Sequence, residues 1–440
     1  MKCLIIAAGK GERLQQRGDS KPLVPILGVP LIERVIRAAM EAGADEFYVV
    51  IGYQGERVRL FLERLVERLA IRITSLVNDD WEKDNGLSVL KARHVLHEPF
   101  LLLMADHLFD PSLVRLLTTP NATAGDVVLV VDRNTRNPLV DMEDVTRVKM
   151  EDGKIHNIGK GLADFNGFDT GIFLCSPAIF KVLEQSKRKD ANTSLSAAVQ
   201  VLAAKGHAKA IPTDDFWIDV DDPAAFHKAE QALLKRLRDK PNDGPVARYL
   251  NRAISVRISR YLVQGDMTPN QISLFSFLCS VLAAGLFALG GYVALLLGGV
   301  LAQFASIIDG CDGEVARLKY QSSDFGGWFD AVLDRYADAF LLFGLTWHLL
   351  AVDGNGWILF VGFMAIIGSF MLSYTADKYD NLMCERLKAD GKTGLRMGRD
   401  VRVFLIFLGA VANIVLPILV LIAVVMNVET LRRIMIARNA

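Results

Sequence analysis

The stretch "DGCDGEVARLKYQSSDFGGWFDAVLD", from Asp309 to Asp334, decides the fold of the second half of the chain. It contains five Asp, one Glu, one Arg and one Lys, and it follows 42 residues, 267–308, that carry no charge. One membrane-spanning helix needs roughly 20 apolar residues, so the uncharged run is long enough for two. Gly290 and Gly291 offer a turn between them. We therefore expect two spans that end at a cluster of carboxylates.

The carboxylates of this stretch have helical spacing. Asp309 and Asp312 are three residues apart, and Asp330 and Asp334 are four apart, so the members of each pair share one face of a helix. Four carboxylates at the ends of membrane helices repel one another unless cations lie between them. One or two divalent ions that hold a diphosphate and its leaving group are the natural ligands of such a cluster.

Small residues and one arginine separate the two carboxylate pairs. Gly313, Ala316 and Gly326 leave room for a ligand or a close helix, and Arg317 can pair with a phosphate or a carboxylate. The whole pattern resembles the CDP-alcohol phosphotransferase signature, and every defined position matches. The resemblance implies that these four residues shape a nucleotide site and that the four aspartates bind Mg²⁺, with Mn²⁺ as an alternative. It also makes Asp334 the base that deprotonates the acceptor alcohol when CMP is displaced.

Further apolar runs complete a helical membrane domain. A third span is expected over about 329–351 and a fourth over about 355–376. The run 403–428 is either one long helix or a hairpin at Asn413, and the positive-inside rule favours the hairpin, because one helix would export the C-terminal arginines. We expect six spans, with both termini in the cytoplasm. Four arginines among apolar residues in 246–262 favour an interfacial helix before them.

A second basic group precedes the fifth span. The segment "GLRMGRDVR", 394–402, supplies Arg396, Arg399 and Arg402, and the last two are three residues apart. These residues either clamp a phosphorylated acceptor or anchor a cytoplasmic loop, and the sequence supports both interpretations equally. Substitution of Arg399 would separate them, because only the first interpretation predicts a raised KM for the acceptor with normal membrane insertion.

The first half of the chain alternates apolar runs with helical stretches. Runs such as 47–53, 71–77 and 126–131 are typical of buried strands, which indicates an α/β fold with a largely parallel sheet covered on both faces. The opening apolar run is too short for a signal peptide, so we expect a cytoplasmic N-terminus. The expected divisions are a cytoplasmic domain over 1–228, a helix end and linker over 229–245, the interfacial helix over 246–264 and the membrane domain over 265–440.

A glycine-rich loop follows the first expected strand. In "AAGKGERL", 7–14, Gly9 and Gly11 would let backbone amides approach a phosphate, and Arg13 and Lys21 add positive charge for a triphosphate. Position 14 is Leu where a dinucleotide-binding loop has a third Gly, and the Gly-Lys-Ser/Thr of a Walker loop is missing. The loop therefore predicts a phosphate site of another kind.

Carboxylates follow two of the expected strands. Asp106 comes after the apolar run 100–105, at the carboxyl end of a strand, where open α/β sheets bind ligands. Asp219 and Asp221 have the i, i+2 spacing that places both on one face of a strand. Carboxylates from two strand ends can hold Mg²⁺ on a triphosphate. The sequence does not choose between Asp219 and Asp221 as the second ligand.

These residues together resemble the sugar-phosphate nucleotidyltransferase family. The resemblance covers about 1–228 and rests on A-A-G-x-G-x-R-L…K-P-L, Asp106 and the W-x-D at 217–219. It implies a Rossmann-like, mostly parallel sheet and attack of an acceptor phosphate on the α-phosphorus of a nucleoside triphosphate. The residues it implicates are Arg13 and Lys21 for phosphate charge, Asp106 and Asp219 for Mg²⁺, Ala8, Gly9, Gly11, Asn85 and Gly86 for the nucleotide, and Lys160 and Asp169 for the acceptor.

The composition of the whole chain supports two further expectations. The formal net charge of the 440 residues is zero, and we expect no nucleic-acid partner. Five scattered Cys without metal-like spacing indicate reduced thiols.

The fusion of the two domains resembles the bifunctional inositol-1-phosphate cytidylyltransferase and di-myo-inositol phosphate phosphate synthase family. That resemblance implies CTP, inositol 1-phosphate and CDP-inositol as substrates and intermediate, a lipid bilayer as location and a homodimer formed through the membrane domain.

The sequence leaves two other interpretations of the whole chain open. The same two chemistries could serve phospholipid synthesis, with another polyol or choline phosphate and a lipid acceptor. A transporter gated by a nucleotide-binding domain is the alternative from another class of protein. It is disfavoured because the carboxylates cluster at helix ends, whereas transporters place intramembrane charges near the midplane.

Overall fold

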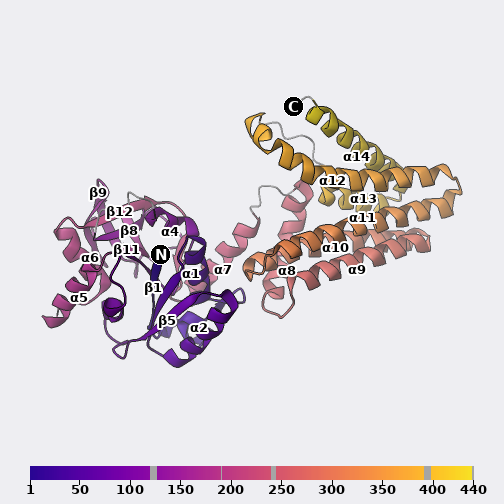
Figure 1. The fold of residues 1–440 in the computed structure, drawn as a ribbon. Coiled ribbons are helices and arrows are strands. Elements are labelled where there is room, and N and C mark those ends of the chain that lie inside the picture. Colours follow the sequence, from indigo (N-terminus) through magenta and orange to yellow (C-terminus); the bar gives the residue numbers. More distant parts are fainter. Residues whose placement is uncertain (119–125, 190, 239–243, 391–397, 439–440) are drawn as a thin grey trace. The chain divides into compact units, whose positions relative to one another are not determined.

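The chain consists of two compact units, Met1–Leu233 and Leu234–Ala440, in the computed structural model (Figure 1). The division falls inside 229–245, the segment expected to end a helix and link the domains. The structure describes residues 1–118, 126–189, 191–238, 244–390 and 398–438, with side chains except at 376–390 and 437–438.

The first unit is built on strands and helices that alternate along the chain. Its strands are β1 Lys2–Ala7, β2 Pro25–Ile26, β3 Val29–Pro30, β4 Glu46–Ile51, β5 Arg72–Val77, β6 Phe100–Met104, β7 His107–Phe109, β8 Val127–Asp132, β9 Arg147–Glu151, β10 Lys154–Gly159, β11 Gly167–Cys175, β12 Ala208–Thr213 and β13 Trp217–Asp219. Its helices are α1 Leu31–Glu41, α2 Gly55–Leu69, α3 Gly86–Leu90, α4 Pro111–Leu117, α5 Ala178–Arg188, α6 Leu195–Ala204 and α7 Pro223–Arg238, with short 3-10 helices at Glu12–Arg17, Lys21–Leu23 and Lys91–His94.

A nine-stranded sheet in the order β5-β4-β1-β6-β11-β8-β12-β10-β9 forms the core of this unit. Successive residues of β1 point to opposite faces, so that Cys3 and Ile5 join one buried apolar cluster and Leu4 joins the other. The expected α/β fold with a covered sheet is confirmed. The sheet is more mixed than expected, because β11 runs antiparallel to both β6 and β8, and β10 runs antiparallel to β9 and β12.

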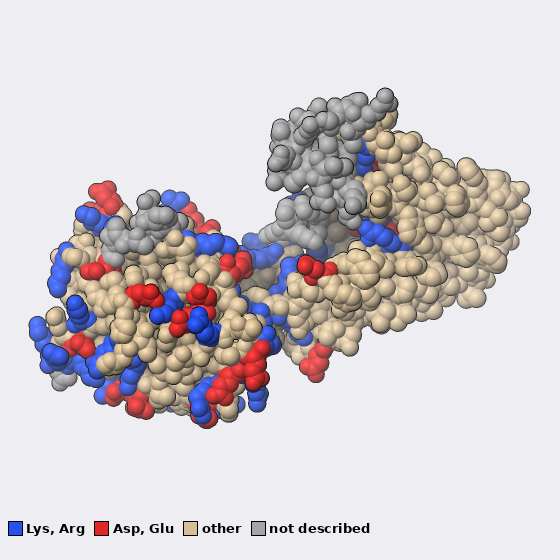
Figure 2. All heavy atoms as spheres, in the orientation of Figure 1, with Lys and Arg blue, Asp and Glu red and all other residues tan. Residues whose placement is uncertain are grey.

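Within the described residues, the second unit is helical throughout. A π-helical turn, Ala247–Asn251, leads into α8 Arg252–Leu262, and the long helices are α9 Pro269–Leu289, α10 Tyr292–Leu318, α11 Asp324–Asp353, α12 Trp357–Asp390, α13 Arg399–Val411 and α14 Val415–Arg438. In the part of the chain that the structure describes, four segments are long and apolar enough to cross a membrane: Pro269–Leu289, Tyr292–Leu318, Trp357–Thr375 and Val415–Ile436. Figure 2 shows charged side chains scattered over the first unit and a mostly uncharged surface on the visible helical body of the second.

Local sequence signals set the ends of these helices. The Thr268 side chain accepts from the Gln271 N–H, and the Gln271 side chain accepts from the Thr268 N–H, which forms a capping box at the start of α9. The chain reverses between α13 and α14 at Asn413, whose φ is 57°. The run 403–428 is therefore a hairpin, the alternative that the loop charges favoured.

Helix α8 differs in part from the amphipathic helix that its arginines predicted. Arg252 is only 8% exposed, and its Nη1 donates to Glu314 Oε1 on α10 at 2.6 Å. Glu314 also accepts from the hydroxyls of Ser255 and Ser259, at 2.6 and 2.7 Å. One face of α8 thus binds α10 through buried polar groups, while Arg257 is exposed. Arg252 is therefore not available to a membrane surface, because it balances a buried carboxylate.

Candidate active sites

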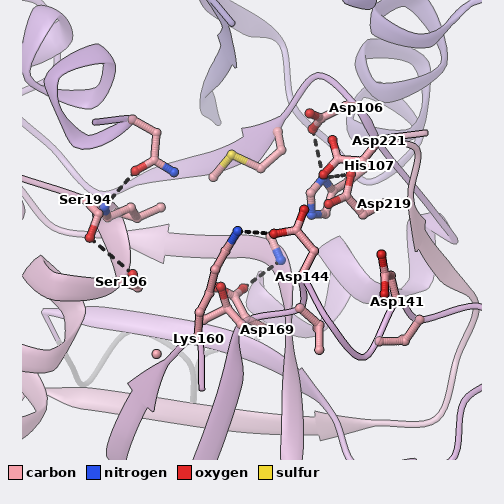
Figure 3. A pocket seen from close by; sticks show the side chains of 18 of the residues that line it. Asp106, His107, Asp141, Asp144, Lys160, Asp169, Ser194, Ser196, Asp219 and Asp221 are labelled. Atoms are coloured by element: carbon pink, nitrogen blue, oxygen red, sulfur yellow. Dashed lines mark hydrogen bonds and ion pairs between the residues drawn. The ribbon is translucent and has the colours of Figure 1, made fainter. Parts of the chain in front are cut away.

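A cavity of about 1020 Å³ opens in the first unit beside the ends of β6, β11 and β13 (Figure 3). Acidic groups and Lys160 project into it from several segments of the chain. Of the residues that the sequence predicted for the nucleotidyltransfer site, those that line the cavity are Asn85, Asp106, Lys160, Asp169 and Asp219, together with Asp221.

Two short strands create the acidic corner of this cavity. β7 and β13 pair antiparallel, and the register places Asp219 opposite His107, beside Asp106. His107 Nδ1 lies 2.9 Å from Asp106 Oδ1 and 3.7 Å from Asp219 Oδ1. Ligand atoms of the three residues all lie within 4.8 Å of one another, which is close enough for one metal ion. His107 is a site residue that the sequence analysis missed.

Cations from the glycine-rich loop and its continuation face these carboxylates. Lys21 Nζ pairs with Asp106 Oδ2 at 2.5 Å and with Asp221, while Arg13 Nη2 pairs with Asp221 Oδ2 at 2.9 Å. Gly11 has a φ of 65°, and a Cβ there would lie 2.4 Å from the Cβ of Lys21. Only glycine therefore lets the loop pass over Lys21, which is buried and points into the site.

The pKa values of the ionisable residues at the acidic corner are shifted in different directions. Burial raises the pKa of Asp219, and the Asp106 carboxylate adds to this effect. Burial acts the same way on Asp106, but the charges of Lys21 and His107 outweigh it and hold the pKa of Asp106 well below its usual range. Burial lowers the pKa of His107, but Asp219 and Asp106 more than offset it and raise this pKa to about 9. The corner therefore holds an ionised Asp106 beside a cationic His107 at neutral pH.

The donor set at this corner fits a divalent cation. Asp219 Oδ1 is buried and accepts no hydrogen bond among the described residues, and its contact with His107 Nδ1 is long at 3.7 Å, so the oxygen keeps capacity for a cation. Carboxylate oxygens are the ligands that Mg²⁺ prefers. Asp221, in contrast, is paired with Lys21 and Arg13. The geometry therefore favours Asp219 over Asp221 as the second ligand, a choice that the sequence left open.

The motif at 84–86 supports a cavity wall. Asn85 Oδ1 accepts from the Leu195 N–H at 2.8 Å, so it holds the start of α6 in place while it lines the cavity. Gly86 is buried, and a Cβ there would lie 2.0 Å from the Thr193 carbonyl oxygen. Gly86 is not among the residues that line the cavity, and its close approach to Thr193 gives it a packing role beside the predicted nucleotide contact. Ala8 belongs to the buried core, whereas Gly9 is exposed and faces open space.

The expected acceptor residues lie on the other side of the cavity. Lys160 Nζ pairs with Asp144, which also binds Arg13 (Figure 3 shows the first pair). These two hydrogen bonds lower the pKa of Asp144 to about 2. Asp169 Oδ1 accepts from the Gly171 N–H at 2.8 Å, and burial raises the pKa of Asp169 to about 6. Asp144, which the sequence analysis missed, thus links Arg13 to Lys160.

The second unit gathers carboxylates where α10 ends and α11 begins. Ligand oxygens of Asp309, Asp330 and Asp334 lie within 4.8 Å of one another. Asp330 Oδ1 is buried without a hydrogen-bond partner among the described residues, so this group also fits a cation. Asp312 lies outside that group, because it accepts from the Ser273 hydroxyl and the Gly313 N–H.

A pocket of about 170 Å³ adjoins these carboxylates. Asp312 and Asp330 line it, together with groups from the start of α9. The structure thus brings all four predicted nucleotide-site residues to one pocket. These are Gly313, Ala316, Arg317 and Gly326.

Arginines of α13 enter the same carboxylate cluster. Arg399 Nη1 pairs with Asp309 Oδ2 at 2.6 Å and with Asp334 Oδ1 at 2.5 Å. Arg402 Nη2 pairs with Asp338 Oδ2 at 2.7 Å. These are side-chain contacts within the site, which plain anchoring of a cytoplasmic loop does not explain. The side chain of Arg396, the third predicted arginine, lies outside the described residues.

Comparisons with known proteins cover both units. Residues 3–237 match the MobA-like NTP transferase domain, and residues 266–428 match the CDP-alcohol phosphatidyltransferase family. The chain is 38% identical to a bifunctional IPC transferase and DIPP synthase of Rubrobacter xylanophilus, over 98% of this chain and 95% of that protein. A protein of the same name from Aquifex aeolicus is 32% identical, over 97% and 96% of the two chains. The chain belongs to this family.

Two partial similarities accompany the full-length ones. An archaetidylinositol phosphate synthase of Pyrococcus horikoshii is 31% identical over 42% of this chain and 90% of that protein. Among solved structures, the inositol-1-phosphate CTP transferase from T. maritima is 24% identical with a TM-score of 0.48, and the match covers 52% of this chain and 93% of that one.

In this bifunctional transferase, the three site residues that the sequence analysis missed differ in how strong a signal the sequence carries for them. Asp338 continues the four-residue spacing of Asp330 and Asp334, so a longer reading of the helix face would have found it. His107 follows a predicted ligand directly in the chain, but its role depends on strand pairing. Asp144 carries no local signal and is defined only by its contacts.

Proposed function

We propose that the first unit makes CDP-inositol from CTP and inositol 1-phosphate. The second unit then transfers the phosphoinositol group to another inositol 1-phosphate and releases CMP. One observation carries this proposal: two separate carboxylate sites, each with a buried unpartnered oxygen and facing cations, occur in one member of this family. The first site produces the nucleotide-activated alcohol that the second consumes.

In the first reaction, a phosphate oxygen of inositol 1-phosphate attacks the α-phosphorus of CTP. The bond to the β-phosphate breaks, and pyrophosphate leaves. Lys21 and Arg13 lie at the carboxylate corner, where they can exchange carboxylate partners for phosphate oxygens. Lys160 projects from the opposite side and binds the acceptor phosphate, and Asp169 accepts from an inositol hydroxyl.

In the second reaction, Asp334 takes the proton from the acceptor hydroxyl. The hydroxyl oxygen attacks the phosphorus that carries inositol in CDP-inositol, and CMP leaves with the electrons of the broken bond. Gly313 and Ala316 leave space for the nucleotide beside Asp312. Arg399 and Arg402 bind the phosphate of the acceptor by charge-assisted hydrogen bonds.

Both sites are proposed to use Mg²⁺, with Mn²⁺ as an alternative. In the first unit Asp106 and Asp219 would hold it, beside His107, and in the second unit Asp309, Asp330 and Asp334 would do so. When bound, the ion neutralises phosphate charge and stabilises the leaving group.

We also propose six membrane spans, with both termini and both sites on the cytoplasmic side of the cell membrane. The hairpin at Asn413 supports this topology, and the four apolar segments supply four of the six proposed spans, with α11 and α13 as the other two. Arginine-rich loops on one side agree with the positive-inside rule. A homodimer through the membrane unit is part of the same proposal and rests on the family resemblance.

One comparison favours a second candidate function, in which the membrane unit acts on a lipid. That comparison is the similarity of this unit to an archaetidylinositol phosphate synthase. The first unit would then activate inositol phosphate, another polyol phosphate or choline phosphate for phospholipid synthesis. A phosphodiester product that partitions into organic solvent would identify this route.

The test is to incubate the detergent-solubilised protein with CTP, Mg²⁺ and inositol 1-phosphate and to follow the products by phosphorus NMR. Pyrophosphate, CMP and a new water-soluble phosphodiester are expected together. CDP-inositol that accumulates without CMP would keep the first reaction and reject the acceptor. A protein that does not turn over CTP with inositol 1-phosphate would reject the inositol assignment.

A further inference from the structure

Asp338 is a buried carboxylate that the proposed reaction does not use. It lies one helical turn beyond Asp334 on α11 and is 6% exposed. The spacing places Asp330, Asp334 and Asp338 on one face of the helix. A carboxylate buried inside an apolar helix bundle is costly unless it is paired, so its partners indicate its role.

The partners of Asp338 come from two other helices. Its Oδ2 pairs with Arg402 Nη2 at 2.7 Å and accepts from the Ser369 hydroxyl on α12 at 2.9 Å. Its Oδ1 lies 3.5 Å from Arg399 Nε. Asp338 therefore contacts both arginines of α13 and is itself held by α12.

The two arginines differ in the donors that they keep available. The Nε groups of both are buried and have no hydrogen-bond partner among the described residues, but the Nε of Arg399 faces Asp338 Oδ1 at 3.5 Å. A buried N–H without an acceptor is unfavourable, so the Nε of Arg402 is suited to an incoming anion. Asp338 restrains the two guanidinium groups from one side and so sets the direction of the donors that remain.

The contacts of Asp338 with the two arginines do not compete with the binding of a metal ion. Arg399 Nη1 binds Asp309 and Asp334, two members of the carboxylate group that fits a cation, and a bound cation would compete for them. Asp338 is outside that group. Its contacts with the arginines can persist when Arg399 Nη1 leaves the carboxylates, which keeps the guanidinium close to the site.

We propose that Asp338 is a positioning residue that orients Arg399 and Arg402 toward the phosphate of the acceptor, inositol 1-phosphate. This inference rests on the proposed function of the second unit. Asp338 acts through the arginines and does not touch the reacting atoms. It should therefore govern the binding of the phosphorylated acceptor more than the rate of the chemical step.

The test uses the full chain in detergent, supplied with CDP-inositol, while inositol 1-phosphate is varied. D338N should raise the KM for inositol 1-phosphate about tenfold or more, since the variant removes the ion pair that Asp338 makes with each arginine. Both kcat and the KM for CDP-inositol should change by less than about threefold. S369A, which keeps the charge of Asp338 but loosens its hold, should show a smaller rise in the same KM. D353N, at the far end of α11, is the matched control and should behave as wild type.

Two outcomes would overturn the inference. One is an unchanged acceptor KM in D338N, whether or not kcat falls, because a merely structural carboxylate predicts that pattern. If D338N does not fold, the deciding outcome is the KM for inositol 1-phosphate in S369A, and an unchanged value would overturn the inference. A wild-type protein that fails to convert CDP-inositol and inositol 1-phosphate would instead reject the proposed function itself, which distinguishes the two failures.

Discussion

The two candidate sites meet the same electrostatic demand with different architecture. In the first unit, Asp106 and Asp219 are distant in the sequence and meet because β7 pairs with β13. In the second unit, Asp330 and Asp334 are one helical turn apart and need only a helix to share a face. A helix thus encodes its ligands in local spacing, whereas the edge of a sheet depends on which strands pair.

The cations of the two sites also differ in origin. Lys21 comes from a short 3-10 helix and is covered by the glycine-rich loop, while Arg399 and Arg402 project from one face of α13. In both sites the cationic side chains are paired with carboxylates, and they can exchange these partners for phosphate oxygens when substrate binds. If the sites act independently, variants of one should leave the other intact, which the following predictions test.

The largest effect is expected from D330N. Loss of a ligand in the carboxylate group should slow CMP release about a thousandfold, since the charge of the leaving group is no longer neutralised. CTP should still be consumed, so CDP-inositol should accumulate in the phosphorus NMR spectrum. D353N is the control at the other end of the same helix. Normal CMP release by D330N would remove the second site from the mechanism.

The mirror-image variant is K21M in the first unit. Removal of the buried ammonium should slow pyrophosphate formation by about a hundredfold or more, because a donor to the phosphate charge is lost. Supplied CDP-inositol should still be converted at the wild-type rate. K149M removes an ion-paired lysine on β9 and serves as control. A parallel loss of both reactions in K21M would show that the two sites are not independent.

A smaller effect, on stability, is expected from R252M. The variant leaves Glu314, which is fully buried, without its cationic partner. Breaking one side of a buried pair costs about 3 kcal/mol, so the membrane unit should unfold more readily in a detergent or SDS titration. R257M, on the exposed side of the same helix, should change little. Equal stability of the two variants would argue against the buried docking of α8.

The smallest effect concerns pH and the first unit alone. The raised pKa of Asp169, about 6, means that this carboxylate is ionised above pH 6 and protonated below it. The ionised form is the stronger acceptor for the inositol hydroxyl, so the KM for inositol 1-phosphate should rise about tenfold between pH 7 and pH 5. The substrate phosphate also titrates near pH 6. The pH profile of D169N gives the part of the change in KM that comes from the substrate phosphate alone. A profile in D169N identical to that of the wild type would exclude Asp169 from acceptor binding.

The sequence by itself determined much of this protein. Apolar runs established an α/β unit followed by a helical unit, and residue spacing predicted one cluster of four aspartates, Asp309, Asp312, Asp330 and Asp334. The structure groups Asp309, Asp330 and Asp334 and leaves Asp312 outside that group. Loop charges chose the hairpin at Asn413. These features are local, because hydropathy and helical periodicity act over a few turns of chain.

Tertiary structure decided the features that depend on long-range pairing. It set Asp219 opposite His107 through the pairing of β7 with β13, joined Asp221 to Lys21 and Arg13, brought Asp144 into the first site, and turned Arg252 inward toward Glu314. It also buried Gly86 against the Thr193 carbonyl group. No local pattern encodes these contacts, because the partner of a buried charge or of a strand edge is selected by the packing of the whole unit.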